Sequence, residues 1–142
     1  MVNKKYIPPT TLNMGKRVAV EKHLLEKHYS FLKVTLYGES LGCTGRCQPS
    51  EHSPIYTYNL TYTPNKPPKV IVISPELPYN SKVHMYSDKS LCLYYPKDYN
   101  WIPASSHLYD TIVPWTHEWF VFYELYQLTG EWKHPFVNHH KI

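Results

Sequence analysis

The sequence lacks the features that mark several classes of protein. Its three cysteines are too few, and odd in number, for a disulfide scaffold, which favours a reducing compartment. No run of about 18 uncharged apolar residues occurs, and the N-terminal stretch has no apolar segment of signal-peptide length. We therefore expect a cytoplasmic protein without a membrane span.

The signatures of common enzyme and nucleic-acid-binding classes are missing as well. The chain has no glycine-rich phosphate loop, no paired-histidine metal motif and no serine elbow. Its net charge of +4 is spread along the chain instead of gathered in runs, so no nucleic-acid partner is predicted. The sequence predicts neither a cofactor nor a bound metal ion.

The residues that are present indicate one folded domain spanning residues 1–142. This length is usual for a single domain, and fourteen tyrosines and four tryptophans are too many for a disordered chain. Prolines and glycines punctuate the sequence, but no internal repeat or long linker divides it.

Hydrophobic periodicity predicts a helix followed by strands. Apolar residues recur at helical spacing between Asn13 and Tyr29. The segment from Pro75 to Pro114 is predicted to be mostly irregular, with a short fourth strand around Cys92, and irregular segments of this length are usually functional. Runs rich in β-branched and aromatic residues predict three earlier strands, within residues 30–38, 55–63 and 69–74.

A closing helix is predicted from about Thr116 to Thr129. Pro114 precedes it, Thr116 is a candidate N-cap, and Gly130 suits a left-handed turn at its C-terminal end. Because the helix has a broad apolar face, we expect it to pack on the sheet. That face contains Trp119, Phe120, Phe122, Tyr123 and Tyr126.

This order of elements resembles the ubiquitin-conjugating-enzyme fold. The stretches "VHMYSDKSLCLYYP" and "TIVPWTHEWFVFYELYQLTGEW", with Trp101 between them, resemble bacterial ubiquitin-conjugating-enzyme-like proteins of antiphage defence operons, above all those of cyclic-oligonucleotide (CBASS) systems. The resemblance runs from about Tyr56 to Trp132 and is sharpest after His84. It implies an α+β fold in which a four-stranded antiparallel meander is packed by an N-terminal and a C-terminal helix.

Cys92 is the candidate nucleophile, because the resemblance places the active cysteine in the Leu-Cys pair that Cys92 completes. A thiolate attacks an acyl group, holds it as a thioester and releases it to an amine more readily than an oxygen ester would. A free thiol has a pKa of about 8.5, so a modestly lowered pKa or a nearby base is enough to form the reactive thiolate at neutral pH. The alternative interpretation is that Cys92 is a small apolar filler in the core.

His84 is the second candidate catalytic residue. It lies close to where the resemblance places the histidine of a His-Pro-Asn motif, but the triplet here reads His84, Met85, Tyr86. The asparagine credited with stabilising the oxyanion is therefore missing. A backbone amide, Asn100 or His107 could supply a donor. A structural role for His84, in which hydrogen bonds tie the loop, is at least equally supported.

Residues that match the family pattern, most of them aromatic, are expected to hold the long segment against the last helix. Tyr94 and Tyr95 either edge the cleft or belong to the sheet core. The residues expected to form this scaffold are Trp101, Thr111, Pro114, Trp115 and Trp119.

Cys43 and Cys47, with His52 close by, form a rival constellation. Zinc prefers four ligands, and no second pair completes this set. A local disulfide is a second alternative, and two loop thiols in a hairpin between the first two strands are the third.

Two functions follow from the resemblance. The first is a ubiquitin-conjugating-enzyme-like transferase that forms a thioester on Cys92 with the C-terminus of the operon's cyclic-oligonucleotide synthase, a CD-NTase, with a separate activating enzyme where the system has one. The segment from Tyr94 to His107, aromatic and broken by prolines, suits contact with the extended tail of that synthase. The alternative is a catalytically inactive member of the same fold that acts as a protein-binding module.

Overall fold

The computed structural model describes residues 14–64, 66–94 and 105–134. Its elements, in chain order, are α2 (Met14–His28), β1 (Lys33–Tyr37), β2 (Ser40–Cys47), β3 (Tyr56–Tyr62), β4 (Lys69–Ser74), the short 3-10 helix η1 (Ser81–Val83) and α3 (Ile112–Thr129).

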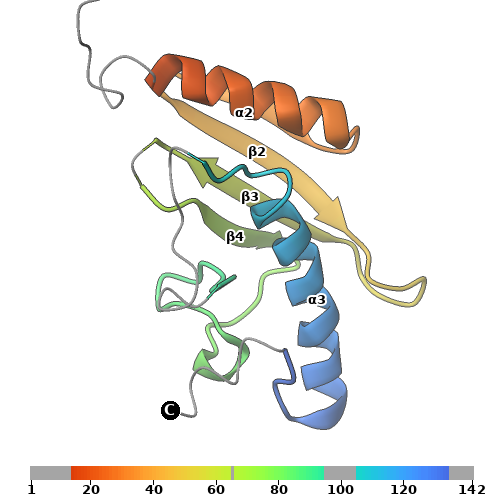
Figure 1. Cartoon of the computed structure of the whole chain (residues 1–142). Coiled ribbons are helices and arrows are strands. Elements are labelled where there is room, and N and C mark those ends of the chain that lie inside the picture. Colours follow the sequence, from red (N-terminus) through yellow and green to blue (C-terminus); the bar gives the residue numbers. More distant parts are fainter. Residues whose placement is uncertain (1–13, 65, 95–104, 135–142) are drawn as a thin grey trace, which may run out of the picture.

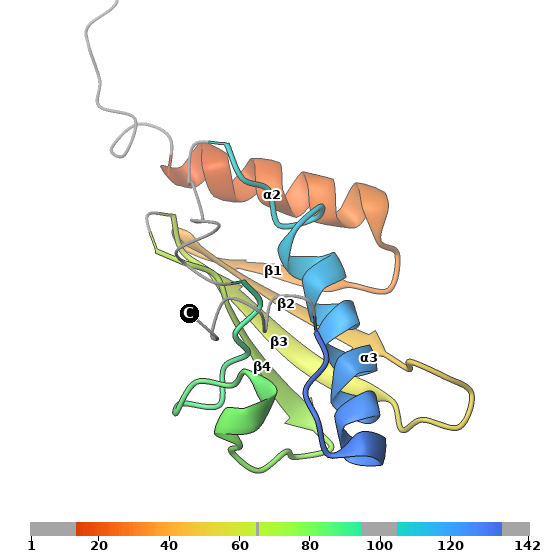
Figure 2. The same cartoon turned by 60° about the horizontal axis from the view of Figure 1, so that its bottom comes forward.

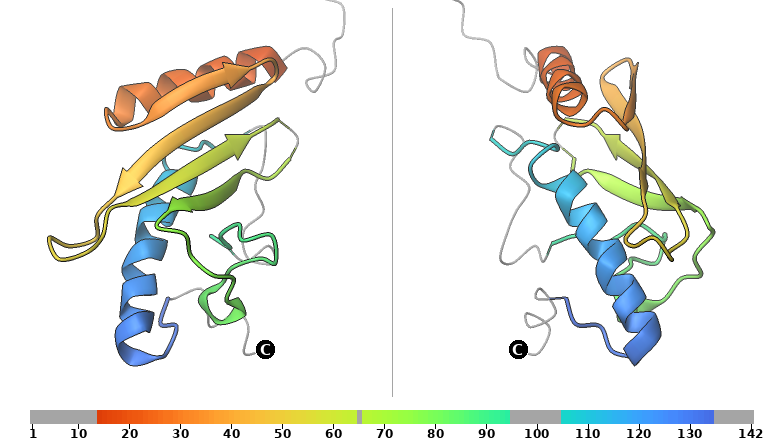
Figure 3. Two further views of the ribbon diagram at one scale, coloured as in Figure 1. Left: turned by 180° about the vertical axis from the view of Figure 1, so that it is seen from behind. Right: turned by 90° about the vertical axis from the view of Figure 1, so that its right-hand side faces the viewer.

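The strands form one antiparallel sheet of four strands in the order β1-β2-β3-β4, which is a meander. Helix α3 crosses one face of the sheet, whereas α2 lies along the side formed by β1 and β2 (Figures 1 and 2). The views in Figure 3 place the segment after β4 beside the C-terminal half of α3. This architecture confirms the predicted α+β, ubiquitin-conjugating-enzyme-like fold.

One strand of the sheet differs from the prediction. Four strands were predicted, but the sheet contains β2, whose residues were assigned to a loop, in place of the strand expected around Cys92. The segment around Cys92 forms only isolated bridges. Strand β2 contains Gly42 and Gly45, which are poor strand formers by propensity. At Gly45 a Cβ would lie 2.5 Å from the Tyr58 hydroxyl oxygen, so the side chain packed over the strand requires a glycine.

The start of α3 also differs from the prediction, whereas its end agrees with it. The helix begins at Ile112, with Thr111 as N-cap residue, so the predicted cap at Thr116 is wrong. Thr116 is buried one turn inside the helix, where its hydroxyl donates to the Ile112 carbonyl at 2.7 Å. The C-terminal prediction is confirmed, because Gly130 has a φ of 78° and its N–H donates to the Tyr126 carbonyl.

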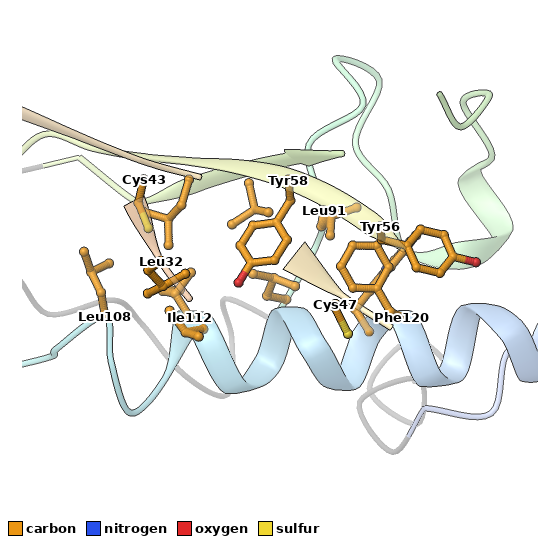
Figure 4. Close-up of a cluster of buried hydrophobic side chains, with 14 of the residues drawn as sticks. Leu32, Cys43, Cys47, Tyr56, Tyr58, Leu91, Leu108, Ile112 and Phe120 are labelled. Carbon is orange, nitrogen blue, oxygen red and sulfur yellow. The ribbon is translucent and has the colours of Figure 1, made fainter. Parts of the chain in front are cut away.

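The hydrophobic core lies between the sheet and α3. Tyr56 of β3 stacks on Phe120 with ring centroids 4.5 Å apart, and the Tyr58 hydroxyl lies 2.8 Å from Nε2 of His117. Figure 4 shows how the side chains of β2 and β3 meet those of α3 across this layer. Large aromatic side chains contribute much of the buried area here, which makes the sheet and α3 one packed unit.

Neither α2 nor α3 combines the length and the apolar composition that crossing a bilayer would need, and the same holds for every other helix in the described part of the chain.

Candidate active site

Cys92 lies on a small hairpin that follows β4. Met85 and Leu91 pair across this hairpin, and the Cys92 N–H donates to the His84 carbonyl at 2.8 Å. The Tyr86 N–H donates to the Ser90 carbonyl at the same distance, and Lys89, with a φ of 71°, closes the turn. The backbone of the hairpin therefore fixes where the Cys92 side chain emerges.

Polar contacts attach the hairpin to the edge of the sheet. The Leu91 N–H donates to the Val70 carbonyl of β4 at 2.9 Å. The Asp88 carboxylate accepts from the Ser90 N–H at 2.9 Å and pairs with Lys69 at 2.7 Å. These hydrogen bonds hold the pKa of Asp88 well below its ordinary value, because they favour the ionised carboxylate.

Aromatic residues attach the same region to α3, as the sequence predicts for Trp119 and Trp115. The buried Trp119 donates its indole N–H to the Val83 carbonyl at 2.9 Å. Trp115 packs on Tyr94, two residues after the cysteine, with ring centroids 5.7 Å apart. The start of the hairpin and the chain just after Cys92 are thus both held against α3.

The Cys92 thiol is partly exposed and lies 3.4 Å from the Tyr94 carbonyl, to which it donates. Burial raises the pKa of Cys92 above its ordinary value. The side chain of Tyr86 and, to a smaller extent, the backbone of Tyr94 act in the opposite direction and lower the pKa of Cys92. Cys92 is therefore partly accessible, and its thiol is mostly protonated at neutral pH.

His84 lies opposite Cys92 in the hairpin and caps η1 with a left-handed φ of 55°. Its imidazole stacks on Trp132, which follows α3, with ring centroids 5.5 Å apart. The backbone carbonyl of His84 therefore positions Cys92, whereas its ring contributes to packing. Its predicted catalytic role stays a prediction.

Cys43 and Cys47 are not loop thiols, because both lie on β2 and point into the core, where they are 2% and 8% exposed. Four residues of an extended strand span about 13 Å, too far for the local disulfide considered above. Figure 4 shows the two sulfurs apart from each other, that of Cys43 near Leu32 and that of Cys47 near Phe120. Among the described residues, no three His, Cys, Asp or Glu side chains gather in a way that could hold a metal ion.

Of the two side chains suggested as oxyanion donors, His107 has another partner and Asn100 lies outside the described residues. His107 engages α2, where its Nδ1 lies 2.7 Å from a carboxylate oxygen of the fully buried Glu21. The second oxygen of Glu21 accepts from the Leu108 N–H at 2.8 Å, so this carboxylate fixes the chain just before α3. Asn100, Trp101, Tyr95 and most of the predicted tail-contact segment lie outside the described residues.

Sequence reasoning missed Tyr86, which it named only as the residue standing where an asparagine was expected. The register of the hairpin places Tyr86 on the same face as Cys92, and its side chain lowers the pKa of the thiol. A signal was available in the turn-forming "SDKS" between two short apolar runs, which predicts a hairpin and hence a cross-strand neighbour for Cys92.

A meander packed by α3, followed by a hairpin that presents one partly exposed cysteine, defines a ubiquitin-conjugating-enzyme-like, or E2-like, protein. Comparison with protein families agrees with this class. The family described as "Type II CBASS E2 protein" matches residues 21–140, and the chain belongs to this family. No curated protein matches the chain. The protein therefore has an E2-like role in CBASS antiviral defence.

Proposed function

We propose that the protein is a transferase that carries an acyl group on Cys92 as a thioester. The acyl group is the C-terminal carboxyl of the CD-NTase, the cyclic-oligonucleotide synthase of the same defence system, and its transfer regulates that enzyme. The observation that carries the proposal is the partial exposure of Cys92 on a fixed hairpin, whereas Cys43 and Cys47 are buried. Membership of a CBASS E2 family supports the choice of partner.

The chemistry requires an activated acyl group, such as an acyl adenylate or another thioester, supplied by a separate activating protein. Cys92 loses its proton to solvent, and the thiolate attacks the carbonyl carbon. A carbon–sulfur bond forms as the bond to the activating group breaks. An acceptor amine then attacks the same carbon, an amide forms, and the Cys92 thiolate leaves. We include His84 in the proposed site because its carbonyl accepts from the Cys92 N–H.

The second candidate function is a binding module of the same fold without catalysis. One observation favours it, namely that burial raises the pKa of Cys92 and so disfavours the reactive thiolate. The two functions differ in whether a covalent adduct forms on Cys92, which makes them separable by experiment.

The test mixes the protein with the CD-NTase of its own system, an activating enzyme and ATP, and follows adducts by non-reducing electrophoresis and intact mass. We expect an adduct that a thiol reductant removes and that Cys92→Ala abolishes. Cys92→Ser is expected to give a more stable oxygen ester, which a disulfide adduct could not give. Deleting the C-terminal tail of the CD-NTase is expected to remove the adduct.

Cys47→Ala is the matched control, because it removes a buried thiol and leaves the hairpin unchanged. We expect this variant to form the adduct as the wild-type protein does. An adduct that persists in Cys92→Ala would refute the transferase. Stable binding of the CD-NTase without any adduct would leave the binding module as the function.

A further inference from the structure

Tyr86 approaches the Cys92 thiol because of the register of the hairpin. Since Met85 pairs with Leu91, Tyr86 faces Ser90 and lies diagonally across from Cys92 on the same face. Diagonal neighbours in an antiparallel pair are within reach of an aromatic side chain. In agreement with that register, the side chain of Tyr86 lowers the pKa of Cys92.

The tyrosine is suited to donate this hydrogen bond. Burial raises the pKa of Tyr86 above its ordinary value, and the contact with Cys92 raises it further. The hydroxyl therefore keeps its proton at neutral pH and acts as a donor, not as a base. The side chain of Tyr86 is 48% exposed, so an incoming acyl group can approach it.

We propose that Tyr86 is a catalytic residue whose hydroxyl donates a hydrogen bond to the Cys92 sulfur and stabilises its thiolate. This inference rests on the proposed function, in which the thiolate appears twice. It is the nucleophile when the carbon–sulfur bond forms, and it is the leaving group when an amine breaks that bond. The tyrosine keeps its own proton in both steps, and the thiol and amine protons pass to solvent.

The proposal gives a physical reason for a tyrosine at this position. A charged acceptor forms a stronger hydrogen bond than a neutral one, so the Tyr86 hydroxyl favours the thiolate over the thiol. Tyr94 acts on the same sulfur through its backbone, because its carbonyl accepts from the neutral thiol and a backbone hydrogen bond of Tyr94 also lowers the pKa of Cys92. Tyr86 therefore offsets part of the cost that burial imposes on the thiolate.

The test is the pH profile of Cys92 alkylation by iodoacetamide, measured by peptide mapping in the full-length protein. Tyr86→Phe removes the hydroxyl and keeps the ring. We expect the midpoint of the profile to move to higher pH and the rate at pH 7 to fall about threefold to tenfold, because one pKa unit is a tenfold change in thiolate. The rate at the high-pH plateau is expected to change little. Tyr79→Phe, at a tyrosine that is also 48% exposed, is the matched control and is expected to leave the midpoint unchanged.

Replacing Tyr86 by 3-fluorotyrosine provides a second measurement that does not depend on losing the hydroxyl. Its more acidic hydroxyl is a stronger donor, so the midpoint is expected to move to lower pH. A midpoint that stays constant in both variants, with thermal melting confirming that they fold, would overturn the proposal. So would a lower midpoint in Tyr86→Phe.

This experiment is separable from the test of the proposed function, because alkylation needs neither the CD-NTase nor an activating enzyme. A shifted profile without any conjugation adduct would refute the transferase but retain the action of Tyr86 on the thiol. An adduct that forms at the wild-type rate in Tyr86→Phe, together with an unchanged profile, would retain the transferase and exclude Tyr86 from its catalysis.

Discussion

The cysteines of β2 and the cysteine of the hairpin belong to two different environments in one small protein. Cys43 is sealed between the sheet and α3, and burial raises its pKa to about 12. Cys47 lies further along the same face, where burial and the nearby Glu124 carboxylate raise its pKa to about 11. Cys92 is partly exposed, and a tyrosine hydroxyl opposes the effect of burial. The residue type is the same in all three, so surroundings decide which thiol can react.

The largest expected difference between the two environments is in alkylation rate. In the native protein at pH 8, we expect iodoacetamide to modify Cys43 at least about a hundredfold more slowly than Cys92, because Cys43 needs both an opening of the core and ionisation. Timed quenching with peptide mapping measures both rates in one sample. Equal rates would show that the β2 side of the core opens readily and would remove the contrast.

Close packing over β2 is expected to make this strand intolerant of added volume. A Cβ at Gly45 would lie 2.5 Å from the Tyr58 hydroxyl oxygen and 2.7 Å from a methyl carbon of Leu32. We expect Gly45→Ala to lower the free energy of unfolding by about 2–3 kcal/mol, measured by urea denaturation. Gly15→Ala is the control, since no atom lies within 4 Å of its Cβ and α2 is expected to lose no stability. A Gly45→Ala protein as stable as wild type would contradict this description of β2.

Exchanging sulfur for oxygen is expected to affect the two environments differently. Cys43→Ser puts a hydroxyl into an apolar site and is expected to cost about 1–2 kcal/mol in the free energy of unfolding. Cys92→Ser, on the partly exposed hairpin, is expected to change that free energy by about 0.5 kcal/mol or less. Equilibrium urea unfolding of the two variants, side by side, tests the difference. A larger loss in Cys92→Ser would place that residue in the core instead.

The smallest expected effect concerns His117, a partly buried histidine of α3 that contacts β3. Burial lowers the pKa of His117, whose Nε2 lies 2.8 Å from the Tyr58 hydroxyl. The unfolded chain therefore binds a proton more readily than the folded protein, and stability falls as pH decreases below about 6.5 towards the lowered pKa. We expect His117→Asn to reduce this pH dependence by about 1 kcal/mol or less between pH 7 and 5.

The control for this pH dependence is His52→Gln, because His52 is 89% exposed. We expect it to leave the slope of stability against pH unchanged. Burial also lowers the pKa of His134, so a residual slope of the same sign is expected in His117→Asn. A slope that His52→Gln reduces more than His117→Asn does would contradict the assignment to the buried ring.

Part of the fold was predictable because its signals are local. The helical spacing of α2, the aromatic alternation of β3 and the apolar run of β4 each lie within a few consecutive residues. The end of α3 was predictable from Gly130 for the same reason. Its start was not, since Thr111 and Thr116 are both possible caps by residue type, and the helix begins after Thr111.

The sequence by itself determined the two helices, the strands β1, β3 and β4 and the identity of Cys92 as the candidate nucleophile, because periodicity and the family resemblance are both properties of consecutive residues. Only the tertiary structure decided that β2 is a core strand, since the need for Gly45 arises from Tyr58 on the neighbouring strand. The turn-forming "SDKS" indicates a hairpin, but the register that brings Tyr86 to the same face as Cys92 depends on contacts of this hairpin with β4 and α3. Burial and the exact register of paired strands depend on residues of other elements, so a local pattern alone does not fix them.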